Sequence, residues 1–121
     1  MNRFHGAFPI LYVEDVEETI DFYGSTFGFE ATYRWGEGGK TVFAFLELEP
    51  VGMGVALRPP DEDEGRSFAL WIYADDVDES AERLRAAGAS EVLPPTDQPW
   101  GERMCSFIDA DGHLVHVGAK V

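Results

Sequence analysis

The chain has 121 residues, 45% of them hydrophobic and 13% aromatic, which is enough for one packed domain. Its 23 acidic and 9 basic residues give a formal net charge of −14, which argues against binding to nucleic acid or to an anionic membrane. No apolar stretch approaches the length of about 18 residues that a membrane-spanning helix needs. Residues 1–6 lack a secretory apolar segment, and the single cysteine, Cys105, excludes an internal disulfide. We therefore expect a cytoplasmic protein.

The first predicted elements are a buried strand and an amphipathic helix. Residues 8–13 form a short apolar run that is typical of a buried strand. Asp15 is a favourable N-cap, and Glu18 three residues later completes a capping box. Gly28 is suited to ending the helix in a left-handed conformation. The expected buried face of this helix consists of four apolar residues spaced four, three and four apart: Val16, Ile20, Tyr23 and Phe27.

Three strands are predicted next, at residues 29–35, 41–48 and 53–58. In the first of them apolar and polar residues alternate, as in a half-buried strand. Glycine-rich residues 36–39 and the Pro50 turn separate the three strands. The first module, residues 1–58, therefore has the order βαβββ.

The second half of the chain repeats this order. Glu-Asp-Val-Glu-Glu-Thr at residues 14–19 returns as Asp-Asp-Val-Asp-Glu-Ser at residues 75–80. Two prolines and four consecutive acidic residues predict a solvated linker at residues 59–66. The second module is assigned to residues 67–121, with a helix that begins after Asp76 and closes at Gly88. Its strands are expected at residues 68–74, 91–93, 103–109 and 113–118, with a proline-rich loop at residues 94–101.

These elements predict an α+β fold of two tandem βαβββ modules that form a curved, barrel-like mixed sheet with a central cavity. One helix cannot cover both faces of a four-stranded sheet. The two sheets must therefore share a concavity, either within the chain or across a dimer. Exposed strand edges favour a homodimer.

Four segments carry a resemblance to a known family. The chain resembles the vicinal oxygen chelate superfamily, which includes glyoxalases, bleomycin-resistance proteins and ring-cleaving dioxygenases. The resemblance covers essentially the whole chain and implies a fold, whereas the reaction has to be argued from the site. The segments are residues 11–15, residues 22–29 with Phe22-Tyr23 and Phe27-Gly28-Phe29, Pro99-Trp100-Gly101, and Asp109-Ala110-Asp111-Gly112-His113.

The resemblance also implies where a metal would be held. Metal-using members place four ligands symmetrically in the first and last strands of each module. The corresponding positions here are Phe8, Ala56, Ala69 and His116. A catalytic site of this kind needs about three nitrogen or oxygen ligands from the protein, and only His116 offers one. We therefore expect no metal and no cofactor, although His113, Glu47 or Cys105 could rebuild a different site.

The same strand faces carry large flat side chains and small ones, which is typical of a pocket for a planar or partly apolar molecule. Aromatic rings would also attract a cation. For Phe8 and Trp71 a ligand contact and a place in the core are equally plausible. The candidate ligand-binding residues are Phe8, Tyr12, Ala56, Arg58, Ala69, Trp71, Trp100 and His116.

Several polar residues of the chain allow more than one interpretation. His116 is either a hydrogen-bonded core residue or a ligand contact or general base near neutral pH. Arg58 could clamp a carboxylate or phosphate, but we prefer its pairing with the acidic residues 61–64. Cys105 is interpreted as a core thiol. The Asp-rich segment 109–112 is interpreted as a turn, since the helices and distal glutamate of a calcium loop are missing.

Two functional hypotheses follow. The first is a metal-free protein that binds and sequesters an antibiotic-like, planar or cationic small molecule, as bleomycin-resistance-like members of the resembled family do. The alternative is a metal-dependent glyoxalase-like lyase or dioxygenase with a non-standard ligand set, in which the metal would polarise substrate oxygens. The missing donors at Phe8, Ala56 and Ala69 favour the first. No catalytic residue is assigned.

Overall fold

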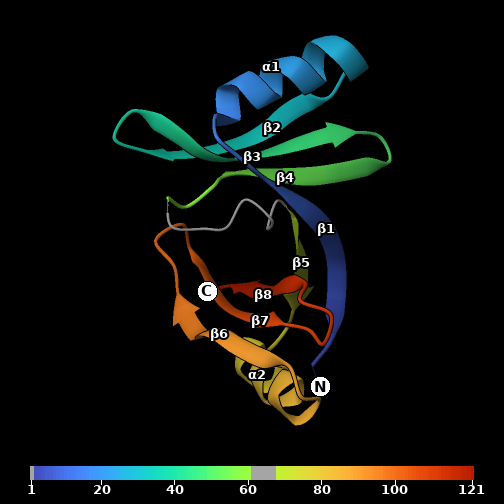
Figure 1. Ribbon diagram of the computed structural model, residues 1–121, viewed down its shortest axis with the longest axis vertical. Coiled ribbons are helices and arrows are strands. Elements are labelled where there is room, and N and C mark those ends of the chain that lie inside the picture. The colour runs from blue at the N-terminus through green and yellow to red at the C-terminus, as the bar shows by residue number, and fades with distance from the viewer. Residues whose placement is uncertain (1, 61–67) are drawn as a thin grey trace. The chain divides into compact units, whose positions relative to one another are not determined.

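The computed structural model describes residues 2–60 and 68–121, and its colour gradient in Figure 1 follows the chain through two βαβββ modules. The predicted α+β class is confirmed. Two compact units are present: residues 8–68, and residues 69–121 together with residues 1–7. The elements are β1 (Phe4–Val13), α1 (Val16–Phe27), β2 (Glu30–Glu37), β3 (Lys40–Leu48), β4 (Val51–Leu57), β5 (Phe68–Ala74), α2 (Val77–Ala86), β6 (Ser90–Asp97), β7 (Glu102–Ile108) and β8 (Leu114–Lys120).

In the unit of residues 8–68, the strands lie in the order β2-β3-β4-β1. The β2–β3 and β3–β4 pairs are antiparallel, and β4 pairs with β1 in parallel. Helix α1 lies along one face of this sheet (Figure 1). Because side chains alternate along each strand, the apolar side chains of one sheet face point toward the helix. The buried core of this unit consists of Val16, Ile20, Ala44, Leu46 and Val55.

Helix α1 begins and ends where the sequence predicts. The Asp15 carboxylate accepts a hydrogen bond from the Glu18 backbone N–H at 3.0 Å, which satisfies one of the unpaired donors of the first turn. Gly28 ends the helix with φ of 88°, a conformation that side chains with a Cβ resist. The repeated motif works in the same way in α2, where Asp76 accepts from the Glu79 N–H at 3.0 Å.

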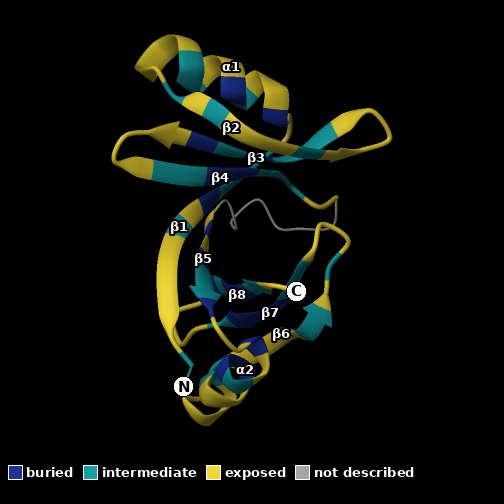
Figure 2. Cartoon of the chain, turned by 180° about the vertical axis from the view of Figure 1, so that it is seen from behind, coloured by how far each residue is buried: buried dark blue, intermediate teal, exposed yellow. Residues whose placement is uncertain are grey.

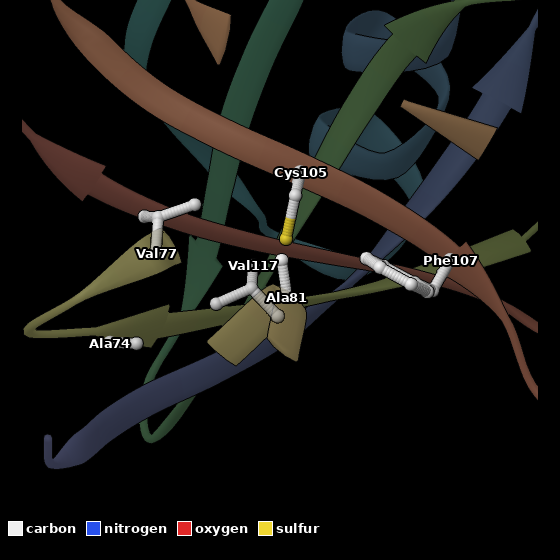
Figure 3. Close-up of a cluster of buried hydrophobic side chains, with 6 residues drawn as sticks. All are labelled: Ala74, Val77, Ala81, Cys105, Phe107 and Val117. Atoms are coloured by element: carbon white, nitrogen blue, oxygen red, sulfur yellow. The ribbon is translucent and has the colours of Figure 1, made fainter. Parts of the chain in front are cut away.

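In the other unit, the strands lie in the order β5-β8-β7-β6, with a parallel β5–β8 pair and antiparallel pairs for the rest. The core lies between this sheet and α2, and its side chains converge in Figure 3. Phe107 and Cys105 are completely buried there. The full cluster is Ala74, Val77, Ala81, Cys105, Phe107 and Val117.

Strand β6 differs from the prediction. The sequence predicts a strand at 91–93 and then a proline-rich loop, whereas β6 continues through Pro94 and Pro95 to Asp97. Because β6 has a partner on one side only within its unit, a missing proline N–H costs no ladder hydrogen bond when it faces away from β7. Register shifts between Glu91 and Leu93, and between Leu93 and Thr96, accompany the prolines.

Strand β1 also begins four residues earlier than predicted, at Phe4. Hydrogen bonds rather than apolar burial hold this first part. The Asp75 N–H donates to the Arg3 carbonyl at 2.9 Å, and the Asp76 N–H donates to the Asn2 side-chain oxygen at 2.9 Å. Hydropathy patterning carries no signal for such contacts, which explains why the extension was missed. Neither α1 nor α2 combines the length and apolar character that a membrane-crossing helix requires.

Candidate functional site

The first group of predicted site residues lies on β5 and β8. Trp71 and His116 are register partners in the parallel β5–β8 pair, and their ring centroids are 5.7 Å apart. Ala69 precedes Trp71 by two residues and so shares its face, opposite to the face that packs on α2. All three are buried, with 6% of Ala69, 6% of Trp71 and 8% of His116 exposed. The structure therefore brings these three predicted residues together.

A serine that the sequence reasoning missed orients His116. Ser106 on β7 is the register partner of His116, and its Oγ lies 2.7 Å from His116 Nδ1. Both side chains are buried. Burial also lowers the pKa of His116 to about 4, so the imidazole is neutral at pH 7. The signal that could have revealed Ser106 is its position: in the predicted β7–β8 hairpin it stands opposite His116.

The second group lies in the unit of residues 8–68. Tyr12 on β1 is paired in register with Ala56 on β4. The ring of Phe8 meets the ring of Phe45 on β3 edge to face, with centroids 4.9 Å apart. These side chains lie on the sheet face opposite to α1, because the other face carries the core. The structure thus assembles Phe8, Tyr12 and Ala56 on one face of one sheet.

The glycines on these two faces do not leave empty space. The ring of Phe43 covers Gly54, where an added Cβ would lie 2.8 Å from its Cε1. In the other unit the ring of Trp71 covers Gly118 in the same way, at 2.3 Å from the added Cβ to Cζ2. Each glycine is required because an aromatic ring approaches the backbone, and the chain's own rings fill that volume.

Arg58 directly follows β4 and is largely buried, with 20% of its side chain exposed. Its Nη2 donates to the Tyr12 carbonyl at 3.3 Å, and Nη1 lies 3.9 Å from the highly exposed carboxylate of Glu14. These contacts anchor the guanidinium at the end of β1. The preferred pairing with acidic residues 61–64 falls outside the described residues.

Trp100 lies in the turn between β6 and β7. Its indole Nε1 donates to the Glu102 carboxylate at 2.7 Å, and 37% of the residue is exposed. This hydrogen bond fixes the ring at the surface of the turn. Its predicted role at a cavity mouth stays a prediction.

The donor chemistry at the four family ligand positions does not fit a metal ion. Phe8, Ala56 and Ala69 present a phenyl ring and two methyl groups, which have no lone pairs to coordinate an ion. His116 has one ring nitrogen engaged with Ser106. A site of this family type would lack at least two of its protein ligands.

Two of the three alternative donors named from the sequence, Cys105 and His113, serve other purposes. Cys105 belongs to the buried core against α2, and burial raises the pKa of its thiol to about 11, so the thiol is protonated at neutral pH. His113 lies in the turn before β8, where its Nδ1 is 3.0 Å from Asp109 Oδ2. Asp109 Oδ1 also accepts the backbone N–H groups of Asp111 and His113.

Within the described part of the chain, one group of potential metal ligands has its ligand atoms within 4.8 Å of one another: Asp109, Asp111 and His113. All three are exposed. The hydrogen bonds from the backbone and side chain of His113 lower the pKa of the Asp109 carboxyl, so Asp109 stays ionised as the acceptor that closes the turn. The interpretation of this segment as a turn is consistent with these contacts.

Two βαβββ modules, each with one helix on one sheet face and aromatic side chains on the other, define the class of glyoxalase-like proteins. The sequence profile of the Glyoxalase/Bleomycin resistance protein/Dioxygenase superfamily matches residues 5–117. The chain belongs to this superfamily.

Two curated relatives and one solved structure are similar to this chain. The chain is 30% identical to an uncharacterized protein of Mycobacterium bovis, in an alignment that covers 93% of this chain and 82% of the relative. It is also 26% identical to the fosfomycin resistance protein FosX of Listeria innocua, in an alignment that covers 90% of this chain and 84% of that protein. The crystal structure of a superfamily member from Vibrio splendidus has the same fold, with a TM-score of 0.71, 19% identity, and coverage of 96% and 98% of the two chains.

Proposed function

We propose that this protein binds and sequesters a small, antibiotic-like molecule that is planar or cationic, and that it does so without a bound metal. The observation that carries the proposal is the composition of the two sheet faces opposite the helices. They present Phe8 and Tyr12 in one unit and Trp71 in the other, and Phe8 itself stands at a position where metal-using relatives need a donor. Aromatic rings favour flat or cationic ligands.

One further observation supports binding over catalysis, and the name of one relative supports a role in antibiotic resistance. The pKa of about 4 at His116 makes its imidazole a weak base, whereas an efficient general base has a pKa near the working pH. The relative from Listeria innocua is named as a fosfomycin resistance protein. Resistance by sequestration needs affinity alone, and the net charge of −14 attracts cationic compounds.

The proposal is tested by a thermal-shift screen of the purified protein against planar and cationic antibiotics. A ligand at 100 times its dissociation constant is expected to add about 2.7 kcal/mol to the free energy of unfolding. Trp71→Leu should abolish the ligand-induced shift, measured relative to the melting temperature of that variant alone. Phe27→Leu, at an exposed residue of α1, should leave the shift intact.

The competing hypothesis is a metal-dependent lyase or dioxygenase, and metal analysis separates the two. Elemental analysis of protein purified from rich medium should find far less than one transition ion per chain. About one ion per chain, together with an activity that chelation abolishes, would establish the enzyme hypothesis. A screen in which no compound stabilises the protein would contradict sequestration.

We also propose that the protein acts as a homodimer. Each described unit has a single helix, which covers one face of a four-stranded sheet. The face that carries Tyr12, which is only partly buried, therefore depends on further packing to leave water. Light scattering coupled to size-exclusion chromatography should give about twice the chain mass of 13.4 kDa. A mass of one chain at all concentrations tested would exclude the dimer.

A further inference from the structure

An open groove lies on the helix side of the unit of residues 8–68, between the end of β1 and α1. Helix α1 packs against β2, β3 and β4, so the apolar side chains of Leu11 and Val13 on β1 remain half-buried beside it. Phe22 closes the other wall from the helix. The groove has a volume of about 350 Å³, which is at the lower end of the range of small-molecule sites.

The aromatic wall of this groove is unusually exposed. Phe22 is 55% exposed, although it belongs to the helix that covers the sheet. Phe27, which the sequence predicts on the buried face of this helix, is 56% exposed and lies outside the groove lining. Figure 2 colours much of α1 as exposed, and the buried residues of this helix are Val16 and Ile20. Phe22 packs edge to face on Tyr23, with ring centroids 5.2 Å apart, so its ring is held in place at the surface. An exposed, fixed phenyl ring is a suitable surface for a cation.

The charge of the groove is negative at the end next to the helix N-terminus. Glu14, Asp15 and Glu18 line it, and none of the described residues that line it is basic. Glu14 has a distant partner in Arg58 at 3.9 Å, and Asp15 accepts the Glu18 N–H as the helix cap. The Glu18 carboxylate has no ion pair among the residues that the structure describes. The arrangement therefore combines an available carboxylate with an adjacent phenyl ring.

We propose that this groove is a second binding site, separate from the sheet faces, for a small organic cation with an apolar body. The ammonium group would lie against Glu18 and the Phe22 ring, while the apolar body would cover Leu11 and Val13. Charge complementarity and the small volume of the groove determine this choice of occupant. The same chemistry could come from a lysine side chain of a protein partner, and the experiment separates these two sources.

The test is a titration of 15N-labelled protein with benzyltrimethylammonium chloride, followed by NMR chemical shifts of backbone amides. We expect saturable shifts centred on residues 11–23, with a dissociation constant in the millimolar range. Phenylacetate, an aromatic anion of similar size, should cause no saturable shift there. Raising the salt concentration to about 1 M, where the screening length is about 3 Å, should weaken binding of the cation.

Matched variants locate the site. Glu18→Gln is expected to weaken binding of the cation about two- to fivefold, the range for one exposed charge interaction, and Phe22→Leu should weaken it similarly. Asp21→Asn changes a carboxylate of the same helix, and Tyr33→Leu changes an exposed ring on β2, both outside the groove lining. These two controls should bind as the unmodified protein does. Thermal unfolding of all four variants confirms that each is folded.

Three results would overturn the proposal. The first is a set of shifts confined to the β5 and β8 residues around Trp71, which would place the cation on the sheet face. The second is equal binding by Glu18→Gln, Phe22→Leu and the two controls. The third is a lysine-containing peptide, acetyl-Leu-Lys-Leu-amide, that binds the groove more tightly than the small cation, which would make the groove a protein-docking surface.

Discussion

Replacing Gly118 with alanine is expected to destabilise the protein by about 1–3 kcal/mol, the usual cost of forcing extra atoms into a packed core. The added Cβ would lie 2.3 Å from Trp71 Cζ2 and 3.0 Å from both Cε2 and Cη2. Trp71 is 6% exposed, so its ring has little freedom to move away. The backbone of Gly118 is not left-handed, and the cost therefore comes from packing alone. Urea unfolding measures it as a lower midpoint at constant m-value.

The double variant Gly118→Ala with Trp71→Leu is the control for this explanation. Leucine is shorter than the indole and leaves room for the new methyl group. The cost of Gly118→Ala should therefore fall to near zero in the Trp71→Leu background, which gives a coupling energy about equal to the original cost. An unchanged cost in that background would show that the destabilisation does not arise from the ring of Trp71.

Stability should fall as the pH decreases from about 6.5 to 4, because of His116. Burial lowers the pKa of this imidazole from 6.5 to about 4 in the folded protein. Between these values the unfolded chain takes up a proton that the folded chain refuses. The contribution to the free energy of unfolding is thus complete above pH 6.5 and is lost progressively toward pH 4. Its full size is about 3 kcal/mol.

Carboxyl groups act in a lower pH window and can be distinguished. The guanidinium of Arg34 lowers the pKa of Glu17, and that of Arg103 lowers the pKa of Asp78. Their contributions are present above the ordinary values of 4.5 and 3.8 and are lost below them. The slope of stability between pH 6.5 and 4.5 should therefore report mainly His116.

Two histidine variants test this assignment through urea unfolding at a series of pH values. His116→Gln keeps an acceptor for Ser106 but does not titrate, so the slope between pH 6.5 and 4.5 should become flat. His113→Gln changes an exposed side chain and should leave the slope as it is. A slope that persists in His116→Gln would assign the pH dependence to another group.

The sequence carried most of the fold because the relevant signals are local. Asp15 with Glu18, and Asp76 with Glu79, cap their helices as the repeated motif predicts. Gly28 ends α1 in the left-handed conformation that its position implied. Alternating apolar residues identified the strands, since the periods of helix and strand differ. The prediction ended β6 too early because of Pro94 and Pro95. A proline is compatible with an edge strand, but the sequence alone does not show that β6 lies at an edge.

For the candidate site, the sequence predicted less than it did for the fold, and the tertiary structure decided more. The family resemblance, together with the correspondence between the repeated halves, was enough to locate Phe8, Ala56, Ala69 and His116. It therefore also showed that metal donors are missing at three of these positions. Which residues surround them depends on pairing between distant strands. Ser106 beside His116 comes from the register of β7 on β8.

By itself, the sequence determined the α+β class, the duplicated βαβββ order and the chemistry available at each position, because residue type and spacing set these locally. Only the tertiary structure decided that the ring of Trp71 covers Gly118, that His116 is neutral, and that Leu11 and Val13 flank a groove beside α1. These properties depend on packing and desolvation, which arise when strands far apart in the chain are brought into one sheet.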